Sequence, residues 1–152
     1  MERAKVVMNV SYFLLIFCIS SLIFKKILVK ISGNSMAPTF HSGDIVLSKP
    51  IRKIRRYDIV IFKRKEKLFI KRVIGLPDET LRLSPKGVEI NQRILYEPYL
   101  TEANRYYLRR PMECIIPNDS YFVLGDNRRS SVDSRTLGVI KREEIIVKIF
   151  SK

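Results

Sequence analysis

The sequence predicts a mainly β protein that is attached to a membrane by one N-terminal transmembrane helix. Residues 6–24 carry no charged side chain, and the rest of the chain alternates short segments rich in Val, Ile and Phe with turns containing Gly or Pro. No segment after residue 24 keeps a helical hydrophobic period. A chain of 152 residues is long enough for one moderate core with a small appended lobe.

Residues 1–5 are a short tail, and residues 6–24 are expected to be the anchor. This run is 19 residues long, close to the roughly 20 apolar residues that a spanning helix needs. Two alternatives fit less well. A cleaved secretory signal would end in small residues, whereas Lys25 and Lys26 follow the run directly, and a core helix of a soluble protein would carry a polar face. Basic residues flank the run on both sides, so charge bias gives no clear orientation and leans slightly toward a C-terminus on the inside.

Strands are expected wherever apolar β-forming residues lie between turn residues: 44–47, 58–62, 68–74, 121–124, 138–140 and 144–149. The charged block at 63–67 predicts a hairpin tip in water. Residues 77–117 have a different pattern from the rest of the chain. Short segments of alternating polar and apolar residues at 80–83 and 88–90 lie on either side of a Ser-Pro-Lys-Gly turn. We expect them to form a small β subdomain inserted into a main β core of residues 25–76 and 118–152.

The net charge of +14 is spread along the chain. It would suit nucleic acid, anionic lipid headgroups or a merely solvated surface. The predicted span favours membrane lipid, and no motif supports a nucleic-acid partner. Cys18, in the apolar run, and Cys114 do not readily pair, and the single histidine, His41, leaves no structural zinc set. We expect neither a metal nor a cofactor.

Ser35 is the candidate nucleophile and Lys71 the candidate base. A serine hydroxyl needs a base within hydrogen-bond reach. The single histidine, His41, lies in the same short stretch as Ser35 and is not an obvious base for it, so another residue must take the proton. Strand alternation places Lys71 on one face with Phe69 and Val73, where burial would lower its pKa and leave it neutral. Each residue also has an ordinary interpretation, Lys71 as a surface lysine with a buried stem and residues 33–39 as a turn.

A polar segment at residues 125–135 follows the strand at 121–124. Its two carboxylates, Asp126 and Asp133, alternate with arginines, which favours fixed ion pairs over a loose surface loop. Taken in order, the anchor and the segments 35–39, 43–46, 58–60, 71–78 and 125–138 resemble the bacterial type I signal peptidases, serine proteases with a Ser/Lys dyad.

The resemblance implies a β-rich catalytic core with a smaller β extension, Ser35 as nucleophile and Lys71 as general base. It also implies supporting roles: Ser131 as a hydrogen-bond partner of the lysine, the ion pairs Asp133–Arg135 and Asp126–Arg72, and Met36 in the substrate groove. Two departures stand out. Gly33 replaces a serine whose hydroxyl helps to bind the oxyanion in some members, and Arg129-Ser130 replaces the Asp-Asn of many members.

The expected function is a single-pass cell-membrane endopeptidase, with its catalytic domain on the extracytoplasmic side, that removes signal peptides from preproteins after Ala-x-Ala sequences. One alternative is a catalytically weak relative that acts as a chaperone in surface-fibre assembly. Another is a self-cleaving repressor-type protease, which would need a DNA-binding domain where this chain has its apolar run. The oligomeric state does not follow from the sequence.

Overall fold

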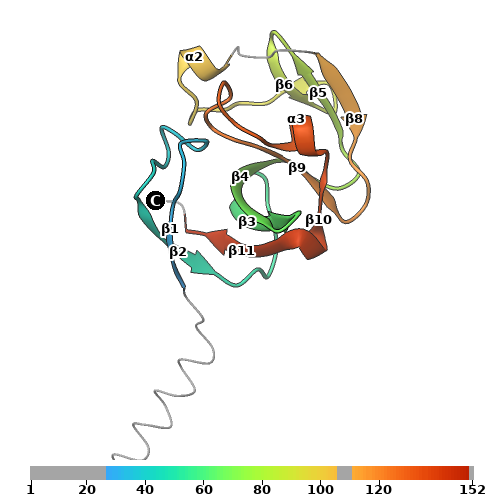
Figure 1. The fold of residues 1–152 in the computed structure, drawn as a ribbon. Helices are drawn as coiled ribbons and strands as arrows, with labels where there is room; N and C mark the ends of the chain where they lie inside the picture. Colours follow the sequence, from blue (N-terminus) through green and yellow to red (C-terminus); the bar gives the residue numbers. More distant parts are fainter. Residues whose placement is uncertain (1–26, 106–110, 151–152) are drawn as a thin grey trace, which may run out of the picture.

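Two antiparallel sheets make up most of the protein (Figure 1). The computed structural model describes residues 27–105 and 111–150. The larger sheet has the order β1-β2-β11-β3-β4-β9-β10 and the smaller one the order β7-β6-β5-β8. The prediction of a mainly β protein is confirmed. The anchor predicted at 6–24 lies outside the described residues, within which no helix is long and apolar enough to cross a membrane.

The seven strands of the larger sheet come from both ends of the described chain. They are β1 (Leu28–Lys30), β2 (Ile45–Lys49), β3 (Ile59–Arg64), β4 (Lys67–Gly75), β9 (Ser120–Leu124), β10 (Ile140–Lys141) and β11 (Ile145–Ile149). The smaller sheet contains β5 (Thr80–Ser84), β6 (Gly87–Ile90), β7 (Arg93–Ile94) and β8 (Met112–Ile115). Strands β1, β7 and β8 are short and were not predicted from the sequence.

The hairpin predicted around residues 63–67 joins β3 to β4. The two strands pair from Ile59↔Arg72 to Arg64↔Lys67. Lys65 and Glu66 form the turn with φ values of 47° and 60°, the left-handed backbone of tight hairpin turns. The charged tip stays in water, and the apolar residues that precede it enter the core.

Three short helical segments interrupt the β structure: α2 (Glu102–Arg105), α3 (Ser134–Leu137) and the 3₁₀ helix η1 (Arg142–Glu144). α3 begins in the polar segment at 125–135, where the sequence predicted no helix. Its N-cap is Asp133, whose side chain accepts a hydrogen bond from the Arg135 backbone N–H. The cap therefore fixes the point at which the loop after β9 turns into the helix.

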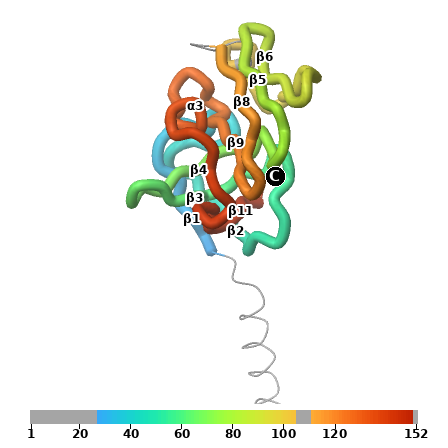
Figure 2. The backbone as a smooth tube through the Cα atoms, turned by 90° about the vertical axis from the view of Figure 1, so that its right-hand side faces the viewer, coloured from blue at the N-terminus to red at the C-terminus, as the bar shows by residue number. Residues whose placement is uncertain are grey.

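The smaller sheet packs on one region of the larger sheet, at the end opposite β1, β2 and β11 (Figure 2). Ile74 of β4 and Phe122 and Leu124 of β9 share a buried cluster with Leu81 and Leu83 of β5. β4 and β9 therefore support the smaller sheet and also carry the polar residues described next.

Candidate active site

The turn after β1 and the middle of β4 bring Ser35 and Lys71 together. Lys71 Nζ lies 2.6 Å from Ser35 Oγ and 2.7 Å from the carbonyl oxygen of Ile70. Lys71 is 3% exposed. Its strand neighbours Phe69 and Val73 belong to one apolar cluster. The pair joins the hydroxyl of a half-buried serine to the amine of a buried lysine at hydrogen-bond distance.

Burial lowers the pKa of Lys71 from 10.5 to about 8, against the opposing effect of the carboxylates of Asp133 and Asp126. Near pH 8 a substantial fraction of the lysine is therefore neutral. A neutral amine has a free lone pair and can accept the proton of a neighbouring hydroxyl.

A pocket of about 500 Å³ opens on this pair. Its wall is mostly apolar and comes from β1 and the residues after it, from β3, from the first half of β4 and from the loop after β9. The side chains that line it include Val29, Ile31, Ser35, Ile61, Leu68, Phe69, Ile70, Lys71 and Val132. Both members of the pair therefore face a cavity that a substrate can enter.

Met36, which the resemblance places in the substrate groove, is not among the residues that line this pocket. Its side chain is 1% exposed and packs in a core cluster with Phe40 and Ile61. Two adjacent residues of this turn therefore differ in environment: Ser35 lines the pocket, and Met36 packs in the core and holds the turn there.

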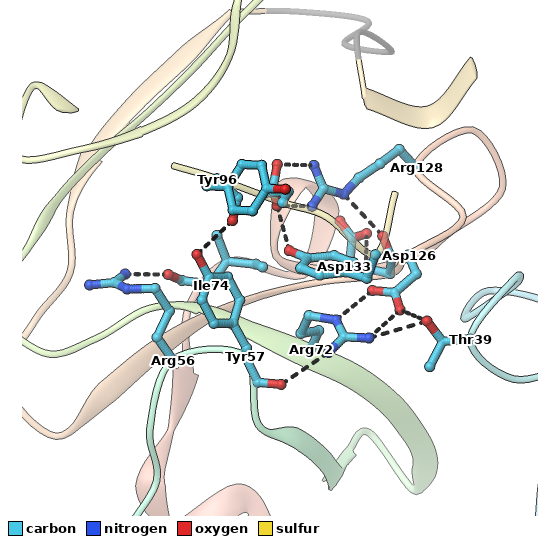
Figure 3. A network of polar contacts seen from close by, with 12 residues as sticks. Thr39, Arg56, Tyr57, Arg72, Ile74, Tyr96, Asp126, Arg128 and Asp133 are labelled. Atoms are coloured by element: carbon cyan, nitrogen blue, oxygen red, sulfur yellow. Dashed lines mark hydrogen bonds and ion pairs between the residues drawn. The ribbon is translucent and has the colours of Figure 1, made fainter. Parts of the chain in front are cut away.

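The expected pair Arg72–Asp126 is present and buried (Figure 3). Arg72 Nε and Nη2 donate to the two carboxylate oxygens of Asp126 at 2.8 and 2.6 Å. Thr39, at the end of the Ser35 turn, donates its hydroxyl to the same carboxylate at 2.5 Å. Sequence reasoning did not assign Thr39 a role. The contact ties the turn that carries Ser35 to β4 and to the loop after β9.

The expected pair Asp133–Arg135 is also present. Arg135 Nε and Nη2 donate to the Asp133 carboxylate, each at 2.8 Å. Asp133 is fully buried and also accepts the backbone N–H of Gly125 at 3.0 Å. The same carboxylate therefore binds the first residue of the loop after β9 and, where the loop ends, caps the N-terminus of α3.

Asn127 attaches this loop to the turn that carries Ser35. Its backbone N–H donates to the Ser35 carbonyl at 3.0 Å, and its side-chain amide donates to the Asn34 carbonyl at 3.2 Å. Asn127 was part of the segment that resembles the signal peptidases, but only the fold reveals this contact. The Ser35 main chain is thus held by a residue that lies 92 positions later in the sequence.

Ser131 lies at the site without making the hydrogen bond expected of it. Its hydroxyl is buried and has no hydrogen-bond partner among the residues that the structure describes. A Cβ atom on Gly125 would lie 2.2 Å from Ser131 Oγ and 2.5 Å from the Ser35 carbonyl oxygen. Ser131, Gly125 and the Ser35 main chain are therefore in tight contact, while Lys71 bonds to Ser35 and to a backbone carbonyl instead.

Gly33, where some signal peptidases have a serine, has φ +84° and open space where a Cβ would be. The position therefore supplies no side-chain donor to the pocket. Within the described part of the chain, no three His, Cys, Asp or Glu side chains are grouped as metal ligands would be.

Comparison with known proteins assigns this arrangement to a family. The sequence profile described as "Signal peptidase, peptidase S26" matches residues 3–151. The chain belongs to this family. It is therefore a serine endopeptidase of the bacterial type I signal peptidase group, as the resemblance implied, and its family activity is the cleavage of signal peptides.

The relatives agree with this assignment along most of their length. Signal peptidase I U of Bacillus subtilis (strain 168) is 34% identical over 145 residues, covering 87% of this chain and 76% of that protein. Signal peptidase I of Bacillus caldolyticus is 35% identical over 135 residues, covering 78% and 74%. The crystal structure of a signal peptidase I from Enterococcus faecalis V583 is 32% identical with a TM-score of 0.59, and the match covers 66% of this chain and 100% of that one.

Proposed function

We propose that the chain is a membrane-anchored endopeptidase that removes signal peptides from exported preproteins with a Ser35/Lys71 dyad. The observation that carries the proposal is the 2.6 Å contact between Ser35 Oγ and the buried Nζ of Lys71. The pKa of Lys71, lowered to about 8, makes a substantial fraction of the neutral base available near pH 8.

The reaction proceeds in two steps, acylation of Ser35 and hydrolysis of the acyl-enzyme, and Lys71 transfers a proton in each. Neutral Lys71 accepts the Ser35 proton as Oγ attacks the scissile carbonyl carbon, and the resulting ammonium then protonates the leaving amine of the mature protein. The signal peptide remains as an ester on Ser35. Lys71, neutral again, takes a proton from a water molecule that attacks the ester, and returns it to Ser35 as the signal peptide leaves.

Substrate binding uses the first half of β4. β9 pairs with β4 only from Arg72 onward, so residues 68–71 have β3 on one side and line the pocket on the other. An extended signal peptide adds there as a strand, with backbone hydrogen bonds supplying affinity. The apolar pocket accepts small side chains at the first and third positions before the cut, which corresponds to an Ala-x-Ala preference.

Residues 6–24 hold the enzyme in the cell membrane as a single-pass anchor, with the catalytic domain on the extracytoplasmic side and the basic surface toward lipid headgroups. A full-length chain is expected in the membrane fraction, and its catalytic domain is expected to be degraded by protease added to intact spheroplasts. Recovery in the soluble fraction, or complete protection in spheroplasts, would contradict the anchor or the orientation.

The dyad is tested by cleavage of a preprotein with an Ala-x-Ala site by the full chain in membranes. Ser35→Ala and Lys71→Ala are both expected to lose activity by at least about a thousandfold. The matched control is Lys86→Ala, an exposed lysine in the turn between β5 and β6. Near-normal cleavage by either the Ser35 or the Lys71 variant would contradict the proposed dyad. A penem-type acylating probe separates the enzyme from a binding-only chaperone, because only the enzyme is labelled at Ser35.

A further inference from the structure

A second buried ion pair joins the segment after β7 to the loop after β9 (Figure 3). The Arg128 guanidinium contacts both carboxylate oxygens of Glu97, one of them through Nη1 at 3.2 Å. Each of these side chains is 3% exposed. Tyr99 donates its hydroxyl to the same carboxylate at 2.6 Å. Neither Glu97 nor Tyr99 lines the pocket.

Arg128 holds the loop that follows β9 from within. Its Nε donates to the Gly125 carbonyl at 3.1 Å, and its own carbonyl accepts from Arg135 Nη1 at 2.8 Å. The residue before it is Asn127, whose backbone N–H donates to the Ser35 carbonyl. An unbroken chain of contacts therefore runs from the Glu97 carboxylate to the main chain of the nucleophile.

Tyr99 contacts the residue that follows Lys71 on β4. The centroid of its ring lies 3.9 Å from the guanidinium carbon of Arg72. Burial and the Glu97 carboxylate raise the pKa of Tyr99, so its hydroxyl remains a proton donor. The segment that carries Glu97 and Tyr99 therefore contacts two arginines: Arg128 through Glu97, and Arg72, the ion-pair partner of Asp126, through Tyr99.

A buried guanidinium is tolerated only when a counter-charge accompanies it, and removal of one partner leaves the other charge uncompensated. Without the Glu97 carboxylate, Arg128 would lose the counter-charge that makes direct contact with it, and the loop would relax toward water. Because reacting groups must be aligned closely, a displacement of about 1 Å at Ser35 lowers turnover by up to about a hundredfold.

We propose that Glu97 is a positioning residue for the dyad: through Arg128 it holds residues 125–128 against the Ser35 main chain. Its effect falls on turnover and not on substrate binding, because Glu97 lies away from the pocket. The kinetic part of this inference rests on the proposed Ser35/Lys71 function. The structural part, the holding of the loop, does not.

The test is Glu97→Gln in the full chain in detergent micelles, compared with Glu79→Gln. Glu79 also contacts Arg56 through both carboxylate oxygens, links the smaller sheet to the larger one, and makes no hydrogen bond to the loop after β9. This pair is less buried than Glu97–Arg128, with the Arg56 and Glu79 side chains 21% and 16% exposed. For Glu97→Gln we expect kcat to fall by about ten- to a hundredfold with KM within about threefold of wild type. Amide hydrogen exchange at Gly125 and Asn127 should rise by at least about tenfold, with exchange in β3 unchanged.

Glu79→Gln is expected to keep the wild-type kcat and the wild-type exchange at Gly125 and Asn127, even where its melting temperature falls. The inference is overturned if Glu97→Gln matches wild type in both readouts, if its exchange rises equally throughout the chain, or if Glu79→Gln reproduces its effects.

Two further measurements cover the cases in which the variant does not fold or the wild-type chain has no activity. If Glu97→Gln does not fold, Tyr99→Phe removes only the hydroxyl donor to Glu97, and we expect the same local rise in exchange with a smaller loss of kcat. Wild-type behaviour of Tyr99→Phe would then overturn the proposal. If the wild-type chain cleaves no preprotein, the proposed function fails, and the exchange at Gly125 and Asn127 alone decides whether Glu97 holds the loop.

Discussion

Lys71 is buried between apolar strand neighbours and close to two carboxylates, which act on its charge in opposite directions. Desolvation has the larger effect on its pKa, and Asp133 and Asp126 only reduce the shift. Both carboxylates already face arginines, Asp133 with Arg135 and Asp126 with Arg72. Because those pairs are close to neutral overall, the field that they exert on the lysine is weak. The arginines therefore help to keep Lys71 uncharged.

The pH dependence of cleavage should follow the protonation of Lys71. Below its pKa of about 8 the lysine is an ammonium ion and cannot accept the Ser35 proton. We expect kcat/KM to fall about tenfold for each pH unit below this value and to level off above it. The measurement is preprotein cleavage between pH 5.5 and 9.5, with circular dichroism at each pH to show that the enzyme remains folded. A rate independent of pH across this range would contradict Lys71 as the base.

The same buried amine should lower the stability of the folded chain at neutral pH. Below pH 8 Lys71 is charged in both the folded and unfolded states, and only the folded state carries the desolvation cost. Between pH 8 and 10.5 the folded state releases the proton first, so wild-type stability rises with pH. We expect Lys71→Met to raise the free energy of unfolding by about 1–3 kcal/mol at pH 6.

Urea unfolding of Lys71→Met and wild type at pH 6 and pH 10 measures this effect, with Lys86→Met as the exposed control. The advantage of Lys71→Met should shrink at pH 10. A difference that stays constant with pH would mean that packing, and not the lysine charge, is responsible.

At the scale of elements, the junction between β9 and its loop has no room for a side chain. A Cβ atom added to Gly125 would lie closer to Ser131 Oγ and to the Ser35 carbonyl oxygen than Cβ atoms approach other atoms in proteins. We expect Gly125→Ala to move the loop away from the turn and to lower kcat by more than about a hundredfold. Cleavage rate and penem labelling of Ser35 measure the effect, and a melting curve reports on folding. Wild-type labelling would show that the close approach is not needed for a working nucleophile.

The elements predicted best were those with a local signal. The β3–β4 hairpin was predicted because five charged residues separate two apolar runs, and the turn needs only residues that tolerate positive φ. Strands β1 and β8 were missed because they are short and partly exposed, so their residues carry little hydrophobic pattern. α3 was missed because its stabilising feature, the Asp133 cap, is a single side chain in a polar segment.

At the scale of the whole molecule, we propose that residues 77–117 form a subdomain that unfolds together with the main core. Leu81 is fully buried in the cluster that the smaller sheet shares with β4 and β9. Leu81→Ala should lower the free energy of unfolding by about 2–5 kcal/mol. Ile94→Ala, in the same sheet but exposed, should change it by less than about 0.5 kcal/mol.

Far-ultraviolet circular dichroism and tyrosine near-ultraviolet signals follow unfolding of these variants. Coincident transitions are expected for a single cooperative unit. Two separated transitions, with only the first moved by Leu81→Ala, would show that the smaller sheet unfolds independently.

The sequence by itself determined the mainly β architecture and the residue types needed for serine chemistry, because apolar alternation, turn residues and a lysine among apolar neighbours are all local properties. Only the tertiary structure decided which of these residues meet. Ser35 and Lys71 are 36 positions apart and Ser35 and Asn127 are 92 apart, and their contacts depend on how β4 pairs with β3 and β9. Strand periodicity specifies a face but not a partner, so the burial of Met36, the unbonded Ser131 hydroxyl and the Glu97–Arg128 pair emerged only from the fold.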